Sequence, residues 1–124
     1  MEMETAYVHL RVKDNILIGI YKKNVHIDLT VAKEIVRTRL SFTRGKKMPS
    51  LILSEGVVSI DKAAREYFVS APATEGLSAT AIVVKTPFSR FLGSVFMQLN
   101  KSPMPVRIFS TQAKAETWLQ QFIQ

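Results

Sequence analysis

The sequence contains no cysteine and no long apolar run. Without cysteine, the chain has no disulfide bond, no thiolate nucleophile and no thiolate metal ligand. Its longest apolar runs, Ile16–Ile20 and Ala79–Val84, are far shorter than the roughly 20 residues that a transmembrane helix needs. The first residues, Met1–Thr5, are acidic and lack the positive region of a signal peptide. These absences predict a cytoplasmic protein without a transmembrane segment.

Groups for acid–base, metal or phosphate chemistry are also scarce. The chain has two histidines, His9 and His26. His26 and Asp28 could supply two metal ligands, but a site needs at least a third, and none lies nearby in the sequence. There is no G-x-S-x-G nucleophile motif, and the five glycines are scattered singly instead of forming a phosphate-binding loop. We therefore expect no catalytic residue, no metal site and no cofactor, and a protein that is not an enzyme.

The residues that are present predict one globular domain over residues 1–124. This length matches a single domain, and 47% hydrophobic with 22% charged residues excludes a wholly disordered chain. Apolar and polar residues alternate over 5–13, which predicts a half-buried strand. Asp14 and Asn15 then give a two-residue turn signal before an apolar strand, Ile16–Tyr21, so that the two strands form a β-hairpin.

Four later segments have apolar residues at the helical spacing of 3.6. The first helix runs to about Phe42, where Gly45 is well placed to end it, and the third covers residues 87–100. The residues predicted to cap the four helices are Asp28 or Thr30, Ser59 or Asp61, Thr86 followed by Pro87, and Ser110 or Thr111.

Short apolar segments between these helices predict three more strands: Ser50–Leu53 after Pro49, Ala79–Val84, and Val106–Phe109. Residues 71–76 read as a loop. The element order is therefore ββαβαβαβα. It indicates an α/β fold with a mixed sheet of about five strands and about four helices, in which the later strands are parallel and the crossovers right-handed.

The positive charge is concentrated in one segment. Of the net charge of +7, residues 33–47 supply +5, because this segment contains six basic residues and one acidic residue, Glu34. Such a cluster can steer an anionic partner, although a solvated helix face has the same pattern. Only one aromatic residue, Phe42, falls inside the segment, which disfavours nucleic acid as the partner. The candidate interaction surface consists of Lys33, Arg37, Arg44, Lys46 and Lys47.

The helix predicted over residues 87–100 has the strongest apolar stripe in the chain. Packing into the core explains such a stripe, and so does a position beside a small ligand pocket. The candidate wall of that pocket consists of Phe88, Phe91, Leu92, Val95 and Phe96.

The stretches Pro87–Phe96 and Leu99–Phe109, together with Trp118-Leu119 in the last helix, resemble a group of uncharacterised bacterial proteins. That group is classed with the SpoIIAA-like or STAS-like fold, also described as STAS/SEC14-like, which is the fold of anti-sigma-factor antagonists. The resemblance covers about residues 5–121. Its most specific part is 90–109, whereas the match to true antagonists rests on the order of elements. It implies a STAS-like α/β domain.

Signalling STAS proteins carry an Asp-Ser-Ser-Gly type loop whose second serine is phosphorylated by a partner kinase. The resemblance aligns Asp61 with the aspartate of this motif, but Lys62 and Ala63 stand at the positions of the two serines. Ser59 lies two residues earlier and is better interpreted as a helix cap. We therefore expect this degenerate switch loop to lack the phosphorylation switch.

Two functional hypotheses follow. In the first, the chain is a non-enzymatic regulatory or protein-interaction module that uses its helix faces and the basic surface. In the second, it is a carrier or sensor that binds a small apolar or anionic ligand against the 87–100 helix. A protein is the expected partner, and a homodimer or transient contact with an anionic membrane surface stays open.

Overall fold

The computed structural model describes residues 2–84 and 102–123. The helix predicted over 87–100 lies outside these residues. The described helices are α1 (Leu29–Thr43), α2 (Lys62–Phe68), α3 (Ala71–Thr74) and α5 (Gln112–Leu119), followed by a 3₁₀ turn over Gln120–Phe122. The strands are β1 (Glu2–Glu4), β2 (Val8–Lys13), β3 (Ile16–Tyr21), β4 (His26–Ile27), β5 (Met48–Ser54), β6 (Ser59–Ile60), β7 (Leu77–Val83) and β8 (Val106–Phe109).

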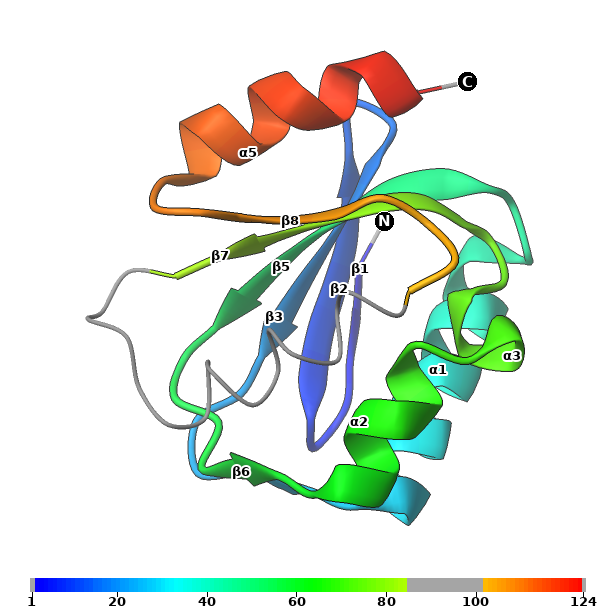
Figure 1. Cartoon of the computed structure of the whole chain (residues 1–124), viewed down its shortest axis with the longest axis vertical. Helices are drawn as coiled ribbons and strands as arrows, with labels where there is room; N and C mark the ends of the chain where they lie inside the picture. The colour runs from blue at the N-terminus through cyan, green and yellow to red at the C-terminus, as the bar shows by residue number, and fades with distance from the viewer. Residues whose placement is uncertain (1, 85–101, 124) are drawn as a thin grey trace.

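Six of the strands form one mixed sheet in the order β1-β2-β3-β5-β7-β8 (Figure 1). The first three strands are antiparallel, and β3, β5, β7 and β8 are parallel to one another. The predicted mixed α/β sheet with parallel later strands is thus confirmed, with six strands in place of about five. Two-residue strands β4 and β6 make a separate small parallel sheet that the sequence pattern is too short to reveal.

The predicted hairpin is confirmed, but its first strand is shorter than expected. Asp14 and Asn15 have φ angles of 52° and 65°, the left-handed conformation that a two-residue hairpin turn requires. Strand β2 begins at Val8 because the Thr5 hydroxyl accepts hydrogen bonds from the backbone N–H groups of Tyr7 and Val8 and so makes a turn. Before this turn, β1 pairs with β2 as an additional edge strand.

The sequence offered two candidate N-caps for each of the helices α1, α2 and α5, and in each helix one of the two is the observed N-cap. Asp28 Oδ1 accepts from the Val31 N–H at 2.8 Å, Asp61 Oδ1 from the Ala64 N–H at 2.9 Å, and Thr111 Oγ1 from the Lys114 N–H at 3.2 Å. The alternatives Thr30, Ser59 and Ser110 are wrong as caps, since Thr30 lies inside α1 and Ser59 lies in β6. Helix α1 ends at the left-handed Arg44, directly before Gly45.

Two predictions around the parallel strands need correction. Strand β5 extends over Met48–Ser54 and includes Pro49, which the sheet tolerates because the β5–β7 register shifts between Met48 and Ser50. Residues Ala71–Thr74, predicted as a loop, form the one-turn helix α3. Pro72 is compatible with this helix because a first turn leaves its N–H groups without helical acceptors.

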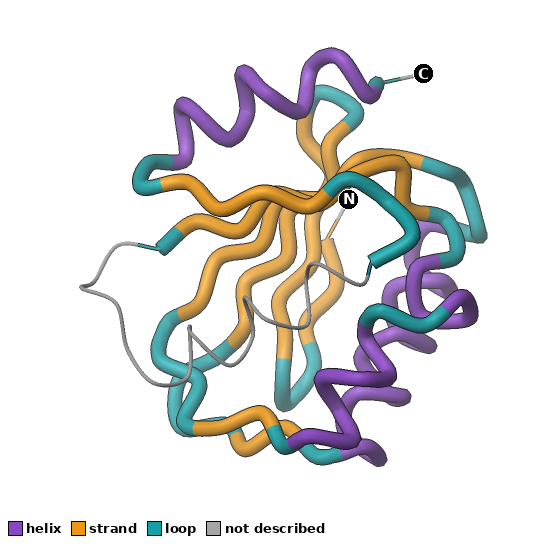
Figure 2. Tube along the Cα trace, in the orientation of Figure 1, coloured by secondary structure: helices purple, strands orange, loops and turns teal. Residues whose placement is uncertain are grey.

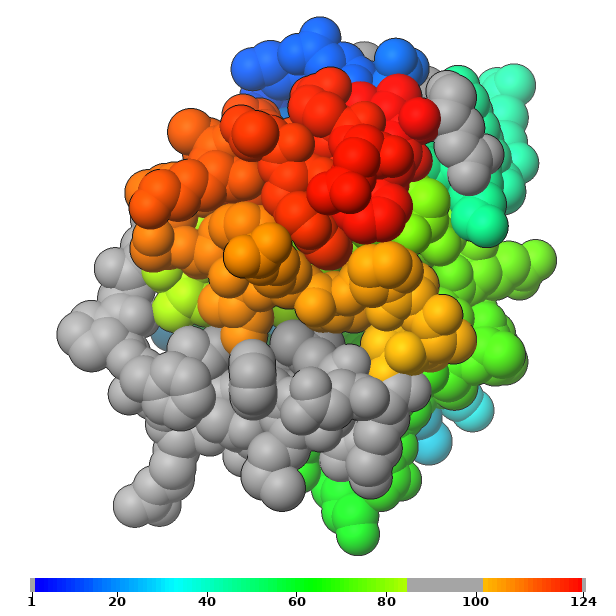
Figure 3. Space-filling view, turned by 45° about the horizontal axis from the view of Figure 1, so that its top comes forward, coloured from blue at the N-terminus to red at the C-terminus, as the bar shows by residue number. Residues whose placement is uncertain are grey.

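The helices cover the two faces of the sheet separately. Helices α1, α2 and α3 lie on one face and α5 on the other, as Figures 1 and 2 show. On the α5 face, Leu119 is fully buried in a cluster with Ile16 and Leu51, and Figure 3 shows the red end of the chain beside the blue β2–β3 turn. None of the helices in 2–84 and 102–123 has the length and apolar character needed to cross a membrane.

Candidate functional site

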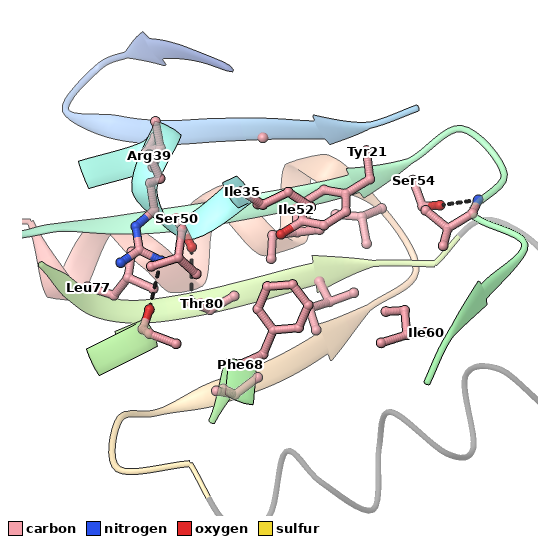
Figure 4. A pocket seen from close by; sticks show the side chains of 18 of the residues that line it. Tyr21, Ile35, Arg39, Ser50, Ile52, Ser54, Ile60, Phe68, Leu77 and Thr80 are labelled. Atoms are coloured by element: carbon pink, nitrogen blue, oxygen red, sulfur yellow. Dashed lines mark hydrogen bonds between the residues drawn. The ribbon is translucent and has the colours of Figure 1, made fainter. Parts of the chain in front are cut away.

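A cavity of about 390 Å³ lies between the sheet and the helices α1–α3. It is lined by strands β3, β5, β7 and β8 and by side chains of α1 and α2 (Figure 4). The cavity is partly open to the outside, and its volume corresponds to roughly 13 waters at about 30 Å³ each. Its size lies within the range of ligand pockets, which begins at about 300 Å³.

Small side chains on the inner face of the sheet create this space. Along β3, Leu17, Gly19 and Tyr21 point toward the cavity because alternate residues of a strand share a face, while Ile18 packs on the α5 side. Gly19 contributes no side chain. A Cβ atom added there would lie 3.5 Å from a methyl group of Leu10, at ordinary van der Waals distance, so the backbone has room for a larger residue.

Two hydroxyl groups form a polar pair on the cavity wall. Ser50 of β5 and Thr80 of β7 are buried, with 5% and 4% of their surfaces exposed. Their side-chain oxygens lie 2.9 Å apart and share a hydrogen bond, and Thr80 Oγ1 also contacts Met104 Sδ at 3.7 Å. Because buried hydroxyl groups are costly when unpaired, the pair lets the sheet keep two short polar residues at this position.

Arg39 of α1 also lines the cavity, at the same end as Ser50 (Figure 4). Its guanidinium group donates to the carbonyl oxygens of Ala73 at 2.9 Å and Glu75 at 2.6 Å, so it holds the end of α3 against α1. Burial lowers the pKa of Arg39, and Tyr21, Tyr67 and Glu75 partly oppose that shift. The described residues place no carboxylate within ion-pair distance of this cation.

Tyr21 of β3 extends into the cavity, and its ring faces the same space as the ring of Phe68 from α2 (Figure 4). Burial raises the pKa of Tyr21 to about 12, although the nearby positive charge of Arg39 opposes the shift. The phenol is therefore neutral at ordinary pH. Its hydroxyl group has no hydrogen-bond partner within 2–84 and 102–123, and the residue pairs with Ser54 across β3 and β5.

The five residues of the predicted basic surface are all exposed. Lys33 and Arg37 lie one turn apart on α1, Arg44 follows at its C-terminal end, and Lys46 and Lys47 continue into the loop before β5. In the described part of the chain, none of them forms an ion pair. Lys33 lies 5.9 Å from the centre of the Tyr67 ring, in a cation–π contact. The sixth basic residue of the segment, Arg39, lies in the cavity wall instead.

The degenerate switch loop lies at the start of α2. Asp61 is the N-cap of this helix, and Ala63 is exposed in its first turn. Ser59 belongs to β6, where its Oγ lies 2.9 Å from His26 Nδ1. An alanine cannot accept a phosphoryl group, so the lack of a switch at position 63 remains our prediction. The described residues contain no group of three His, Asp or Glu side chains that could hold a metal ion.

The predicted pocket wall cannot be compared with the cavity. Phe88, Phe91, Leu92, Val95 and Phe96 lie outside the described residues. Sequence reasoning missed the residues that line the cavity from the sheet and α1. Their signal was weak: Gly19 and Ser50 interrupt apolar strands at inward positions, and Arg39 was counted among surface charges. The missed residues with a direct role in the cavity are Gly19, Tyr21, Arg39, Ser50 and Thr80.

Comparisons with known proteins place the chain in a family without assigning an activity. No curated protein matches it significantly. It is similar to the crystal structure of an uncharacterised protein of the DUF3478 family with a SpoIIAA-like fold from Shewanella loihica PV-4. The two share 11% sequence identity and a TM-score of 0.59, over 94% of this chain and 98% of that one, which confirms the SpoIIAA-like fold. A family model matches residues 10–123, and the chain therefore belongs to the family described as Domain of unknown function (DUF7793).

Proposed function

We propose that this chain is a non-enzymatic binding module that carries or senses a small ligand with an apolar body. The observation that carries the proposal is the cavity of about 390 Å³ between the sheet and α1–α3. Its lining is mostly aliphatic and aromatic, with a few polar groups: Arg39, Ser50 and Thr80 at one end, and Ser54 and Glu55 at the other. This combination is typical of small-molecule sites, in which apolar walls supply affinity and a few polar groups fix the orientation of the ligand.

Binding is tested by isothermal titration of 1-decanol, a neutral probe, into the wild-type chain and two variants at one position. Gly19→Leu places an aliphatic side chain in the cavity, whereas Gly19→Ala adds a single methyl group at ordinary contact distance. We expect the wild type and Gly19→Ala to bind and Gly19→Leu to lose binding at least tenfold. Equal binding by all three proteins, or no binding by the wild type, would contradict the proposal.

A second candidate function rests on the exposed basic surface. Lys33, Arg37, Arg44, Lys46 and Lys47 carry no ion pair to the described residues, so their charges are available to a protein with an acidic face. In this alternative the chain is a regulatory module that recognises such a partner. Long-range attraction of this kind weakens as salt screens the charges.

Charge reversal distinguishes this surface from charge in general. Replacing Arg37, Arg44, Lys46 and Lys47 by glutamate should remove the partners recovered in a pull-down. A control with the same change in net charge reverses four exposed residues elsewhere: Lys13, Lys23, Arg107 and Lys114. If both variants retain the partners of the wild type, the basic surface has no part in recognition.

A further inference from the structure

We propose that the ligand of the cavity is a monocarboxylate with an apolar body, and that Arg39 binds its carboxylate group. This inference rests on the proposed function and names the chemical class of ligand. Its basis is the position of a guanidinium group at one end of a largely apolar cavity, with three N–H donors that have no acceptor among the described residues.

The hydrogen bonds of Arg39 leave donors for a ligand. A guanidinium group has five N–H donors in a planar fork. Two are used by the carbonyl oxygens of Ala73 and Glu75, and the other three have no acceptor among the described residues. The two carbonyl bonds hold the side chain in place without neutralising its charge. Arg39 therefore presents a fixed cation at the cavity wall, and its three remaining N–H donors can pair with a carboxylate.

The charges around the cavity favour a single negative charge on the ligand. Only Arg39 and Glu55 are charged among its described lining residues. Glu55 directly follows Ser54, which lies at the opposite end of the cavity from Arg39 (Figure 4). A monocarboxylate can thus pair with Arg39 while its apolar part lies along Ile52 and Phe68, which keeps the carboxylate away from the negative charge of Glu55.

The size of the cavity limits the apolar part. A volume equal to roughly 13 waters accommodates a ligand of about 10 to 15 non-hydrogen atoms. Decanoate and 1-decanol fall within this range and share the same apolar chain, so their comparison isolates the carboxylate. Decylamine completes the set with a positive head group.

The test measures the affinity of decanoate and 1-decanol for the wild type, Arg39→Met and Arg37→Met at pH 8 by isothermal titration. Methionine keeps most of the apolar stem of arginine and removes the charge. Arg37 lies two residues away on α1 but is exposed, so Arg37→Met is the matched control. Binding of 1-decanol by Arg39→Met also reports whether the cavity remains folded.

We expect the wild type and Arg37→Met to bind decanoate about ten- to a hundredfold more tightly than 1-decanol, which is the usual strength of a hydrogen bond to a charged group. Arg39→Met should bind both probes alike. If the wild type shows no preference, or Arg39→Met keeps it, the carboxylate assignment is overturned and the proposed function stands. If neither probe binds, both fail.

A measurement on Glu55→Gln, in which Arg39 is intact, decides the question if Arg39→Met does not fold. This variant removes the carboxylate with which an ammonium group could pair at the opposite end of the cavity. A cationic head group at the position proposed for the ligand carboxylate would face the guanidinium group. In Glu55→Gln we expect decylamine to bind at least tenfold more weakly than 1-decanol, and equal or tighter binding of decylamine would overturn the inference.

Discussion

The hydroxyl pair of Ser50 and Thr80 provides a test of how the cavity wall is stabilised. The two side chains join β5 to β7 through one buried hydrogen bond of 2.9 Å. Ser50→Ala leaves the Thr80 hydroxyl with only its 3.7 Å contact to Met104 Sδ, and Thr80→Val leaves the Ser50 hydroxyl without a described partner. Each single change should therefore lower the free energy of unfolding by about 1–3 kcal/mol, the usual cost of an unsatisfied buried polar group.

The double variant Ser50→Ala/Thr80→Val removes both partners together. It leaves no hydroxyl group unpaired, so it should be destabilised by less than the sum of the two single changes, with a coupling energy of about 1–2 kcal/mol. Urea denaturation of the wild type, the two single variants and the double variant, followed by circular dichroism, gives the four free energies. Strictly additive effects would refute the reasoning, because they would mean that the two oxygens do not depend on each other.

Two further predictions concern the phenol in the cavity and the cap of α2. Burial raises the pKa of Tyr21 to about 12 in the folded chain from its ordinary value of 10.0, so the stability that this shift contributes is complete below pH 10 and is lost as pH rises through 12. Between pH 9 and 11 the free energy of unfolding of the wild type should therefore fall by about 1.4 kcal/mol more than that of Tyr21→Phe in urea denaturation, and parallel losses would show that Tyr21 titrates normally. Asp61→Ala should lower the free energy of unfolding by about 1 kcal/mol, because the Ala64 N–H loses its acceptor. Asp61→Asn keeps an acceptor and should lower it much less. Equal losses in thermal unfolding of the two variants would show that the cap does not depend on this hydrogen bond.

The regular parts of the fold could be predicted from the sequence because they depend on local patterns. Alternation up to Lys13 and the turn at Asp14-Asn15 determine the hairpin, and Asp28 and Asp61 begin α1 and α2. The misses occurred where a local pattern is too short or a single side chain decides the outcome. Strands β4 and β6 have two residues each, and the Thr5 hydroxyl ends the alternation by making a turn.

The cavity could not be predicted because it depends on residues that meet only through strand register. Ser50 and Thr80 are 30 positions apart in the chain and become neighbours across β5 and β7. Arg39 lies in a run of basic residues whose other members are exposed, and only the packing of α1 against α3 turns it toward the cavity. By contrast, the structure exposes the five basic residues Lys33, Arg37, Arg44, Lys46 and Lys47, as their charge favours, whereas their role as an interaction surface stays a prediction.

The most direct test of a ligand cavity between the sheet and α1–α3 is to locate a bound probe. Intermolecular nuclear Overhauser effects between decanoate and the methyl groups of a labelled chain report contacts at short range. We expect contacts from the methylene chain to Leu10, Ile35 and Ile52 on the cavity side, and none to Ile18 or Leu119 on the α5 side. Contacts only to the α5 side, or no contacts at a saturating concentration of decanoate, would contradict the account.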